Sequence, residues 1–334
     1  MPWFLSPAPT ITFRQNMPDS GVHRPGHPFE AADRFALPIL ILGAALISCS
    51  GIFVKLSEVG PTATGFYRMA LALPFFLVWM LRDSSSRHDT SFVPRDRRSL
   101  AFAMLAGLCL AADLIAWHWC LHMTTVATAT LLGNTTPIWV ALGGFLFLHE
   151  RFRPIFLIGL AVAMIGIGGL IAGGNKPVEI KDAFVLGLGL FTGLAYAGYF
   201  RFGTLARRGL STAQVMFWGS LTASVLLLPV AIATDAAVVP QNLHAWAIVG
   251  GLALLSQVLG QSSINWAMGH LPAAFSSLTL SLNPMFAAIV AWPVLGEALT
   301  PLQMIGGLCV VAGILLARRG RVVASRPPTD PMAT

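Results

Sequence analysis

Ten long apolar runs constrain the fold of this chain more than any other feature of its sequence. A helix needs about 20 apolar residues to cross the roughly 30 Å hydrocarbon core of a membrane, and the runs are close to that length. Only 10% of the residues are charged, whereas soluble proteins have about 25%. The runs also lack the polar alternation of a membrane β-barrel. The sequence therefore predicts an all-α polytopic membrane protein with ten transmembrane helices, over residues 37–57, 62–81, 98–121, 124–148, 155–173, 183–204, 212–233, 244–268, 272–295 and 301–317.

The second half of the chain repeats the first. The stretch "NPMFAAIVAWPVLGEALTP" follows "TPIWVALGGFLFLHERFRP" after 147 positions, so that Pro284 matches Pro137 and Glu297 matches Glu150. Each copy contains five predicted helices. Because five is an odd number, the second copy enters the membrane in the opposite orientation. We therefore expect two inverted five-helix repeats, over residues 37–173 and 183–318.

The inversion itself favours one class of function. Two inverted halves that share a site near the membrane midplane can exchange conformations, which exposes the site to each side of the membrane in turn. A receptor or an enzyme needs only one orientation of its site, although some channels also have inverted repeats. The repeat therefore predicts a transporter that works by alternating access.

The placement of arginine predicts the orientation. With a cytoplasmic amino terminus, the inside segments hold sixteen arginines, and the outside loops hold only Lys176 and Lys181. Positive residues gather on the cytoplasmic side, so we expect both termini in the cytoplasm and the protein in the plasma membrane, the inner membrane of a bacterium. A net charge of +7 that is scattered over short loops does not indicate a nucleic-acid partner. Residues 1–36 are predicted to be a disordered leader and 319–334 a cytoplasmic tail.

The motifs of both copies resemble a known family. Arg68 lies within "GPTATGFYRMALALPFFL", and a proline, a glutamate and a second proline precede spaced glycines in each copy. Over nearly all of residues 37–318 the chain resembles the EamA repeats of the drug/metabolite transporter (DMT) superfamily, and in particular amino-acid exporters of the YddG type. His149 stands where a glycine usually precedes the glutamate, which is a small departure. The resemblance implies a ten-helix exporter of small metabolites, with a central cavity lined by helices one, three, four, six, eight and nine.

Charged residues inside the predicted helices are functional candidates, because burying a charge in a bilayer is costly. At about 1.5 Å of rise per residue, Arg68 and Asp113 are expected at a similar depth, about 10 Å below the outer surface, with Lys55 slightly shallower. We expect Asp113 to pair with Arg68 or Lys55, either as a permanent structural bridge or as a gate that breaks when the outer side opens. Arg201, near the repeat image of Lys55, is expected to act as an inner gate or to extend to the membrane interface.

Polar and aromatic side chains within the helices predict the lining of the cavity. Gln257, Gln261 and Asn265 recur every four residues and form a polar stripe, which we expect to contact a neighbouring helix or a ligand. A lining of aromatic rings and amides with few fixed charges suits zwitterionic or amphipathic solutes, including aromatic amino acids. The predicted substrate-binding residues are Tyr67, Trp117, Asn134, Tyr196, Gln257, Gln261, Asn265 and Asn283.

The repeated prolines are predicted hinges. Pro137 and Pro284 each remove a backbone donor inside an apolar run, which frees a carbonyl that needs a partner or a water-filled cavity. A packing kink is the alternative interpretation. Glu150 and Glu297 close the same runs and are predicted to be turn and cap residues beside the next helix start.

Other classes of function have weaker support. His118 and His122 stand four residues apart without a carboxylate in register, so no metal site is predicted, and no cofactor is expected. An intramembrane enzyme would have to use Ser262 or Ser263 with one of these histidines as base. A channel or passive facilitator, and a carrier for drugs or other metabolites, remain alternatives. The expected partners are a small-molecule substrate and the lipid bilayer, with the chain as a monomer or homodimer.

Overall fold

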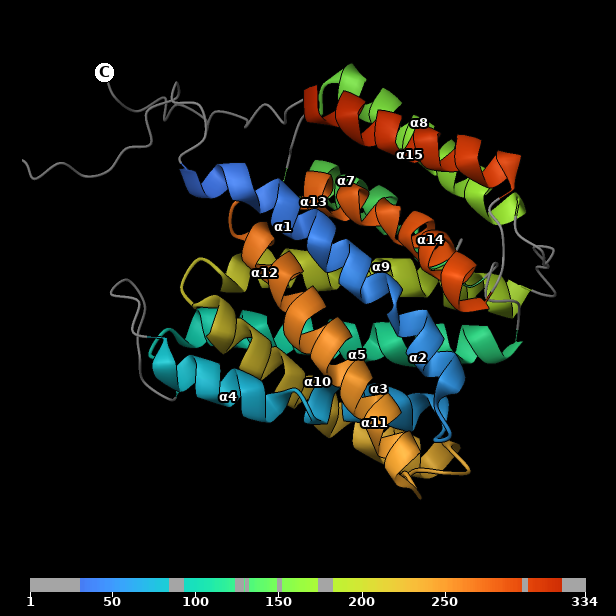
Figure 1. Ribbon diagram of the computed structural model, residues 1–334. Coiled ribbons are helices and arrows are strands. Elements are labelled where there is room, and N and C mark those ends of the chain that lie inside the picture. The colour runs from blue at the N-terminus through green and yellow to red at the C-terminus, as the bar shows by residue number, and fades with distance from the viewer. Residues whose placement is uncertain are drawn as a thin grey trace, which may run out of the picture.

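The computed structural model describes residues 31–83, 93–123, 129, 132–148, 152–173, 183–295 and 300–319. Every secondary-structure element within these residues is a helix (Figure 1). The elements are α1 (Ala31–Ser48), α2 (Ser50–Leu56), α3 (Pro61–Ala70), α4 (Leu73–Arg82), α5 (Arg97–Met123), α7 (Thr136–Leu148), α8 (Pro154–Ala172), α9 (Ala183–Ala206), α10 (Thr212–Thr234), α11 (Leu243–Leu252), the π-helix η1 (Ala253–Gln261), α12 (Ser262–Met268), α13 (Ala273–Thr279), the 3-10 helix η2 (Leu280–Leu282), α14 (Asn283–Leu295) and α15 (Pro301–Arg319).

Eight stretches of the described chain are long and apolar enough to cross a membrane, and α7 contains a shorter apolar helix. Some of these stretches join consecutive elements, such as α1 with α2, and α11 with η1 and α12. The protein is an all-α polytopic membrane protein, as predicted. Of the two remaining predicted spans, 272–295 is divided into α13, η2 and α14, and 124–148 is described only in part.

The first helix begins earlier than the sequence indicated. Residues 31–36 were assigned to the leader, but α1 starts at Ala31. The segment "AADRFA" contains no glycine or proline and is rich in alanine, the strongest helix former, so the helix continues beyond the apolar run. Residues 1–30 and 320–334, which make up most of the predicted leader and tail, lie outside the described residues.

The contact between α8 and α15 relates the two repeats. A Cβ added to Gly159 would lie 2.5 Å from the carbonyl oxygen of Gly313, and one added to Gly166 would lie 2.6 Å from that of Gly306. The 147-residue shift carries Gly159 onto Gly306 and Gly166 onto Gly313, so it exchanges these two contacts. Each contact is converted into the other, so the interface between α8 and α15 is two-fold symmetric. Figure 1 shows α8 and α15 running in opposite directions, as inverted repeats require.

Other helices pack around a central core. The α5 helix lies against α9 and α10, while α1 lies against η1 and α12. These helices meet in a hydrophobic cluster that includes Leu40, Met69, Leu110, Phe200 and Ile264. The cluster therefore joins elements of both repeats. Figure 1 shows α1, α5 and α9 in the middle of the bundle.

The repeated prolines lie at the starts of helices, and their predicted role as hinges stays a prediction. Pro137 and Pro284 lie in the first turns of α7 and α14, where a missing backbone donor needs no partner. The carbonyl of Gly133 accepts a hydrogen bond from Thr136 Oγ1 at 3.0 Å, and that of Leu280 accepts one from the backbone of Asn283. The carbonyls that the sequence predicted to be freed are thus satisfied locally.

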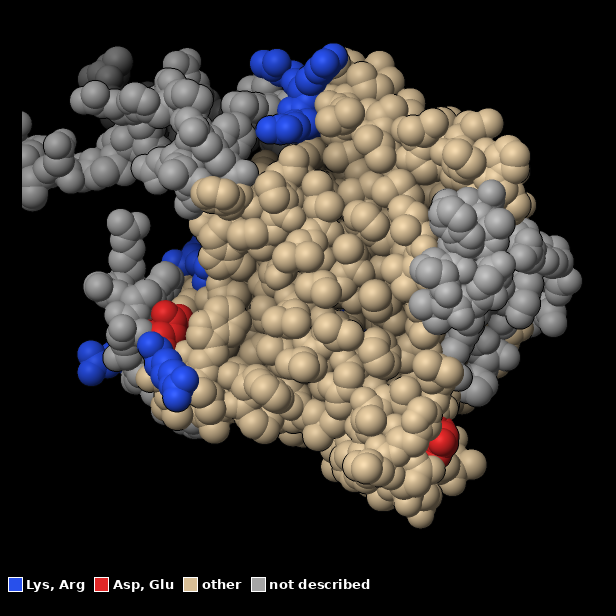
Figure 2. Space-filling view, viewed as in Figure 1, with Lys and Arg blue, Asp and Glu red and all other residues tan. Residues whose placement is uncertain are grey.

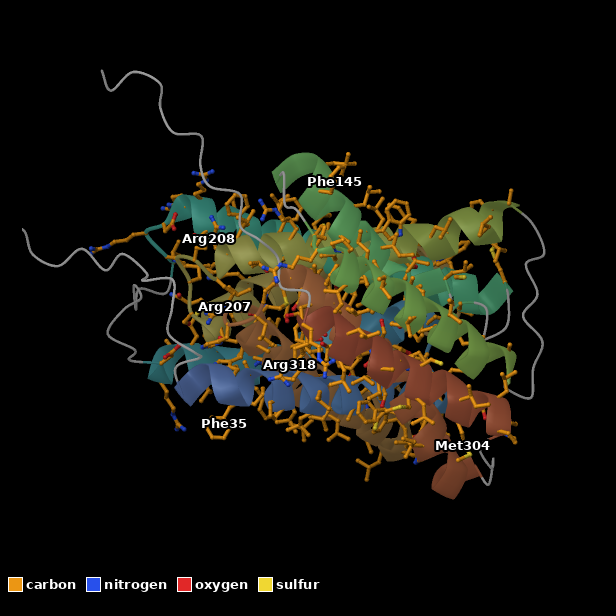
Figure 3. The ribbon with its side chains drawn as sticks, turned by 90° about the horizontal axis from the view of Figure 1, so that it is seen from above. Phe35, Phe145, Arg207, Arg208, Met304 and Arg318 are labelled. Atoms are coloured by element: carbon orange, nitrogen blue, oxygen red, sulfur yellow. The ribbon has the colours of Figure 1, made fainter. Side chains whose placement is uncertain are left out.

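The two ends of the bundle differ in charge. Figure 3 places Arg207 and Arg208 toward one end, which we call the arginine end, and Met304 toward the opposite end. Arg318, in the last turn of α15, lies on the arginine side but nearer the middle. On the face in Figure 2, lysine and arginine gather at the left-hand end, and the middle of the described surface is uncharged. An uncharged belt between polar ends is the surface that a lipid bilayer requires.

Candidate functional site

A cavity of about 1300 Å³ lies between the two repeats. Its lining comes from α1, α2, α3, α5, α7 and α8 in the first repeat, and from α9, α10, η1, α13, η2, α14 and α15 in the second. Residues 57–60 and 235–237, which connect helices at the end of the bundle opposite the arginines, also line it. We call this end the mouth end, because connecting segments border the cavity there.

The mouth end is built from hydrogen bonds between the repeats. Asp235 Oδ2 accepts from the backbone of Ala63 at 2.6 Å and so caps the start of α3. The backbone N–H of Gly60 donates to the Ala237 carbonyl at 2.7 Å. The connection before α3 is therefore held by the connection after α10.

The arginine end is closed by a different set of contacts. Arg207 Nη1 donates to the carbonyl of Leu210 at 2.7 Å, and Arg207 also packs against Gly269. Burial lowers the pKa of the Arg207 guanidinium, and the charge of Asp83 in the first repeat opposes this effect. Asp96 caps the start of α5. The pKa of the Asp96 carboxyl is held below its usual value, mainly by a hydrogen bond from the Ser99 side chain and also by one from the Ser99 backbone.

Arg68 brings a positive charge to the cavity from α3. The residue is buried, with 9% of its surface exposed, and lines the cavity. Its Nε donates to Gln257 Oε1 at 3.2 Å. Within the described part of the chain, the two terminal nitrogens Nη1 and Nη2 have no hydrogen-bond partner. They are therefore available to a molecule in the cavity.

Asp113 brings the opposite charge from α5 and also lines the cavity. The charges of Asp113 and Arg68 interact electrostatically, but no contact within ion-pair distance joins the two residues in the structure described here. The permanent bridge that the sequence suggested is thus not formed between them. Lys55 lies in α2, but its side chain is outside the described residues, so the predicted gate stays a prediction.

The polar stripe of the eighth predicted span is buried and is divided between two environments. Gln261 lines the cavity and donates to the Tyr196 hydroxyl at 3.4 Å. Gln257 and Asn265, exposed by 1% and 0%, are not among the lining residues. Asn265 donates to Tyr199, whose ring stacks on Tyr196 at 5.4 Å between centroids. The sequence correctly grouped the three amides, but only Gln261 faces the cavity.

The broken spans before α7 and α14 bring amides and prolines to the cavity. Asn134, Pro137, Asn283 and Pro284 all line it. The side-chain oxygen Oδ1 of Asn283 is buried without a hydrogen-bond partner. A buried polar atom of this kind is costly unless a water or a ligand satisfies it, so this atom is available for recognition.

The remaining predicted residues are scattered. Trp117 lines the cavity. Tyr67 is not among the lining residues and packs edge-to-face against Trp246 at 5.4 Å, because its side of α3 faces α11. Arg201 lies in α9 and is not a lining residue either. Glu150 and Glu297 lie outside the described residues.

Sequence reasoning missed several lining residues. His118 lines the cavity with 2% of its surface exposed, whereas the sequence favoured a packing role for it. Thr192 of α9 and Asp235 of the mouth end were not singled out. The hydrogen bond from Ala63 to Asp235 crosses 172 positions, so no local pattern in the sequence could have indicated it.

Two repeats of opposite orientation around a shared cavity are typical of membrane transport proteins. Comparison with known families identifies the family. The EamA-like transporter family matches residues 34–172 and 183–319, and the chain belongs to this family. The match contains two copies, as the 147-residue repeat predicted, and it indicates a transporter and not an enzyme.

Curated relatives include exporters of amino acids. The chain is 29% identical over 242 residues to a probable terminal-alkyne amino-acid exporter of Streptantibioticus cattleyicolor, covering 71% of this chain and 79% of the relative. It is 27% identical over 290 residues to the threonine/homoserine exporter RhtA of Escherichia coli K12, covering 83% and 89%. It is 26% identical over 260 residues to the pseudopaline exporter CntI of Pseudomonas aeruginosa PAO1, covering 76% and 84%.

A solved crystal structure has the same fold. It aligns with a TM-score of 0.72 at 17% identity and covers 86% of this chain and 98% of the other. The solved structure therefore shows the same fold. Together with the family match and the apolar helices, the bacterial relatives support an integral membrane protein of the inner membrane.

Proposed function

We propose that the protein exports amino acids, including aromatic ones, by alternating access of the cavity between its two repeats. One observation carries the proposal: Arg68 and Asp113 line the same cavity with opposite charges, and no ion pair joins them. Charges within a membrane are costly without a partner. An α-amino acid supplies both partners, a carboxylate for Arg68 and an ammonium group for Asp113.

The rest of the lining accounts for the side chain of such a substrate. Trp117 and Tyr196 offer aromatic surface, and Gln261, Asn134 and Asn283 offer amides. These groups recognise a neutral or aromatic side chain without a further fixed charge. The exporters of amino acids among the relatives support the same class of substrate.

Alternating access rests on the two ends of the bundle. The cavity is bordered by connecting segments at the mouth end, while Arg207 packs between helices at the arginine end. Positive residues favour the cytoplasmic side, so we place the arginine end and both termini in the cytoplasm. The structure then corresponds to an outward-facing state.

The cavity volume favours a second candidate. About 1300 Å³ exceeds the roughly 300–1000 Å³ of common small-molecule pockets and leaves space beside a single amino acid. A larger amphipathic metabolite with an amino-acid end group would use the same charges. One of the relatives is named as an exporter of a different cargo, pseudopaline.

Counterflow into proteoliposomes tests the proposal. Vesicles loaded with an unlabelled amino acid should accumulate the labelled one, and a panel of neutral, aromatic and larger amphipathic compounds identifies the preferred class. An imposed pH gradient shows whether exchange is coupled to protons. Exchange of no amino acid, with exchange of compounds that lack a carboxylate or an amine, would contradict the proposal.

A further inference from the structure

We propose that Gln257 is a positioning residue, which holds the Arg68 guanidinium so that its two terminal nitrogens bind the substrate carboxylate end-on. This inference rests on the proposed function, because it assigns Arg68 to the carboxylate of an amino acid. Gln257 itself does not line the cavity. It acts through Arg68 and has no contact with the substrate.

Gln257 forms the middle of a buried polar chain. Its Oε1 accepts from Arg68 Nε at 3.2 Å, and its Nε2 donates to Ser220 Oγ at 3.2 Å. Gln257 is 1% exposed and Ser220 is 2% exposed. The chain therefore links α3 of the first repeat to η1 and α10 of the second.

The two partners of Gln257 determine the orientation of its amide. An arginine can only donate hydrogen bonds, so the oxygen of the amide must face Arg68. Ser220 can accept, so it takes the NH₂ end of the amide. A flipped amide would place two donors against each other beside Arg68, which is costly for a buried side chain such as Gln257. Ser220 thus helps to direct the Gln257 oxygen toward Arg68.

The position of Gln257 leaves one mode of carboxylate binding. A guanidinium is a rigid, planar fork that binds a carboxylate through pairs of N–H groups. The side-on mode uses Nε, which Gln257 already occupies. Within the described residues Nη1 and Nη2 are without a partner, and Arg68 lines the cavity. The end-on pair of nitrogens is therefore the one presented to a substrate.

The π-helix contributes to this arrangement. Gln257 and Gln261 both lie in η1, whose wider turn spans residues 253–261. Single π-turns within helices occur frequently at functional sites. Here η1 brings Gln257 to Arg68 and Gln261 to the cavity, so one local distortion serves both groups.

The test compares an amino acid with its methyl ester, which keeps the amine and lacks the carboxylate. The wild-type protein should exchange the free amino acid with the lower KM. Without amino-acid exchange, or without this preference, the proposed function itself fails before any variant is measured. Gln257→Leu should raise the KM of the free amino acid about tenfold, the effect of losing about 1.4 kcal/mol, and leave the ester nearly unchanged.

Two milder variants keep the test decisive if Gln257→Leu does not fold. Gln257→Glu is of similar size and should occupy Arg68 with its own carboxylate, which also abolishes the preference. Ser220→Ala should raise the KM of the free amino acid about threefold, because the amide loses its second anchor. Ser224→Ala is the matched control on α10, because the Ser224 hydroxyl donates only to the Ser220 carbonyl within its own helix, and it should keep both wild-type KM values.

The ratio of the two KM values distinguishes positioning from general damage. Loss of preference in the folded Gln257 variants supports the positioning role. If the folded Gln257 variants keep the wild-type ratio, or weaken both substrates equally, Gln257 does not act through the carboxylate and the inference is wrong.

Discussion

At the scale of residues, the central observation is that an arginine and an aspartate, Arg68 and Asp113, line one cavity and are not joined in an ion pair. Breaking up a buried pair normally costs several kcal/mol, because each charge has lost water without gaining a partner. Water that enters an open cavity hydrates the two side chains and so lowers the free energy that the missing partner costs. A zwitterionic substrate meets it with specific contacts, so the two side chains favour binding of a molecule that carries both charges.

Replacement of Asp113 tests the amine half of this recognition. Asp113→Asn keeps the shape of the side chain and removes its charge, so the KM for amino acids should rise at least about tenfold, since a hydrogen bond to a charged group contributes about 1.5–3 kcal/mol. The corresponding carboxylic acid without an amine serves as the control substrate and should be affected little. Counterflow of both compounds measures the difference, and an unchanged KM for the amino acid would exclude the assigned role.

The same residues show the limits of sequence reasoning. Depth along a helix correctly brought Arg68 and Asp113 to one cavity, because rise per residue is nearly constant. Their separation and the choice of Gln257 as the partner of Arg68 depend on how helices rotate about their axes. Apolar residues on all sides of a membrane helix leave this rotation undetermined by the pattern.

At the scale of elements, the two peripheral helices α8 and α15 are held by glycines. Close approach of backbones through small residues is a common way to pack helices in membranes, where the hydrophobic effect does not drive association. The 147-residue shift exchanges the contacts of Gly159 and Gly166 with those of Gly306 and Gly313. The contact between α8 and α15 therefore holds the last helix of the first repeat against the last helix of the second.

Two glycines on α8 offer a matched test of this packing. A Cβ on Gly166 would meet the backbone of α15 at 2.6 Å, whereas one on Gly168 would have no neighbour within 4 Å. Gly166→Leu should lower stability by about 1–3 kcal/mol or more, as overpacking does, and Gly168→Leu should not. The melting temperatures of the purified proteins in detergent measure the effect. Equal melting temperatures for the two variants would mean that the helices do not pack as described.

Most elements could be predicted from the sequence, and the exceptions have a physical reason. Long apolar runs and the odd number of spans in each copy are enough to predict the all-helical fold. The π-helix η1 and the 3-10 helix η2 were not predicted, because each replaces an α-helical turn by a slightly wider or tighter one without changing the apolar pattern. Both lie beside the cavity, where Gln261, Leu280 and Asn283 line it.

At the scale of the whole molecule, the repeat relates the two ends of the bundle. Segment 57–62 of the mouth end corresponds to segment 204–209 of the arginine end under the 147-residue shift. An aspartate packs against a glycine in both segments, Asp235 against Gly60 and Asp96 against Gly209. The two ends therefore share one kind of contact between the repeats, although their other hydrogen bonds differ. Ends that can open and close with similar energies are the condition for alternating access.

Distances between spin labels at the two ends test this account most directly. One pair reports on the mouth end, with labels at Gln241, in the connection between α10 and α11, and at Met304. A second pair, at Arg208 and Arg318, reports on the arginine end (Figure 3). Cys49, Cys109, Cys120 and Cys309 are replaced first, because all four are free. On addition of a saturating amino acid, the distance at the mouth end should shorten while the distance at the arginine end lengthens. If substrate binds and the two distances change in the same direction, or neither changes, the protein does not expose its cavity alternately.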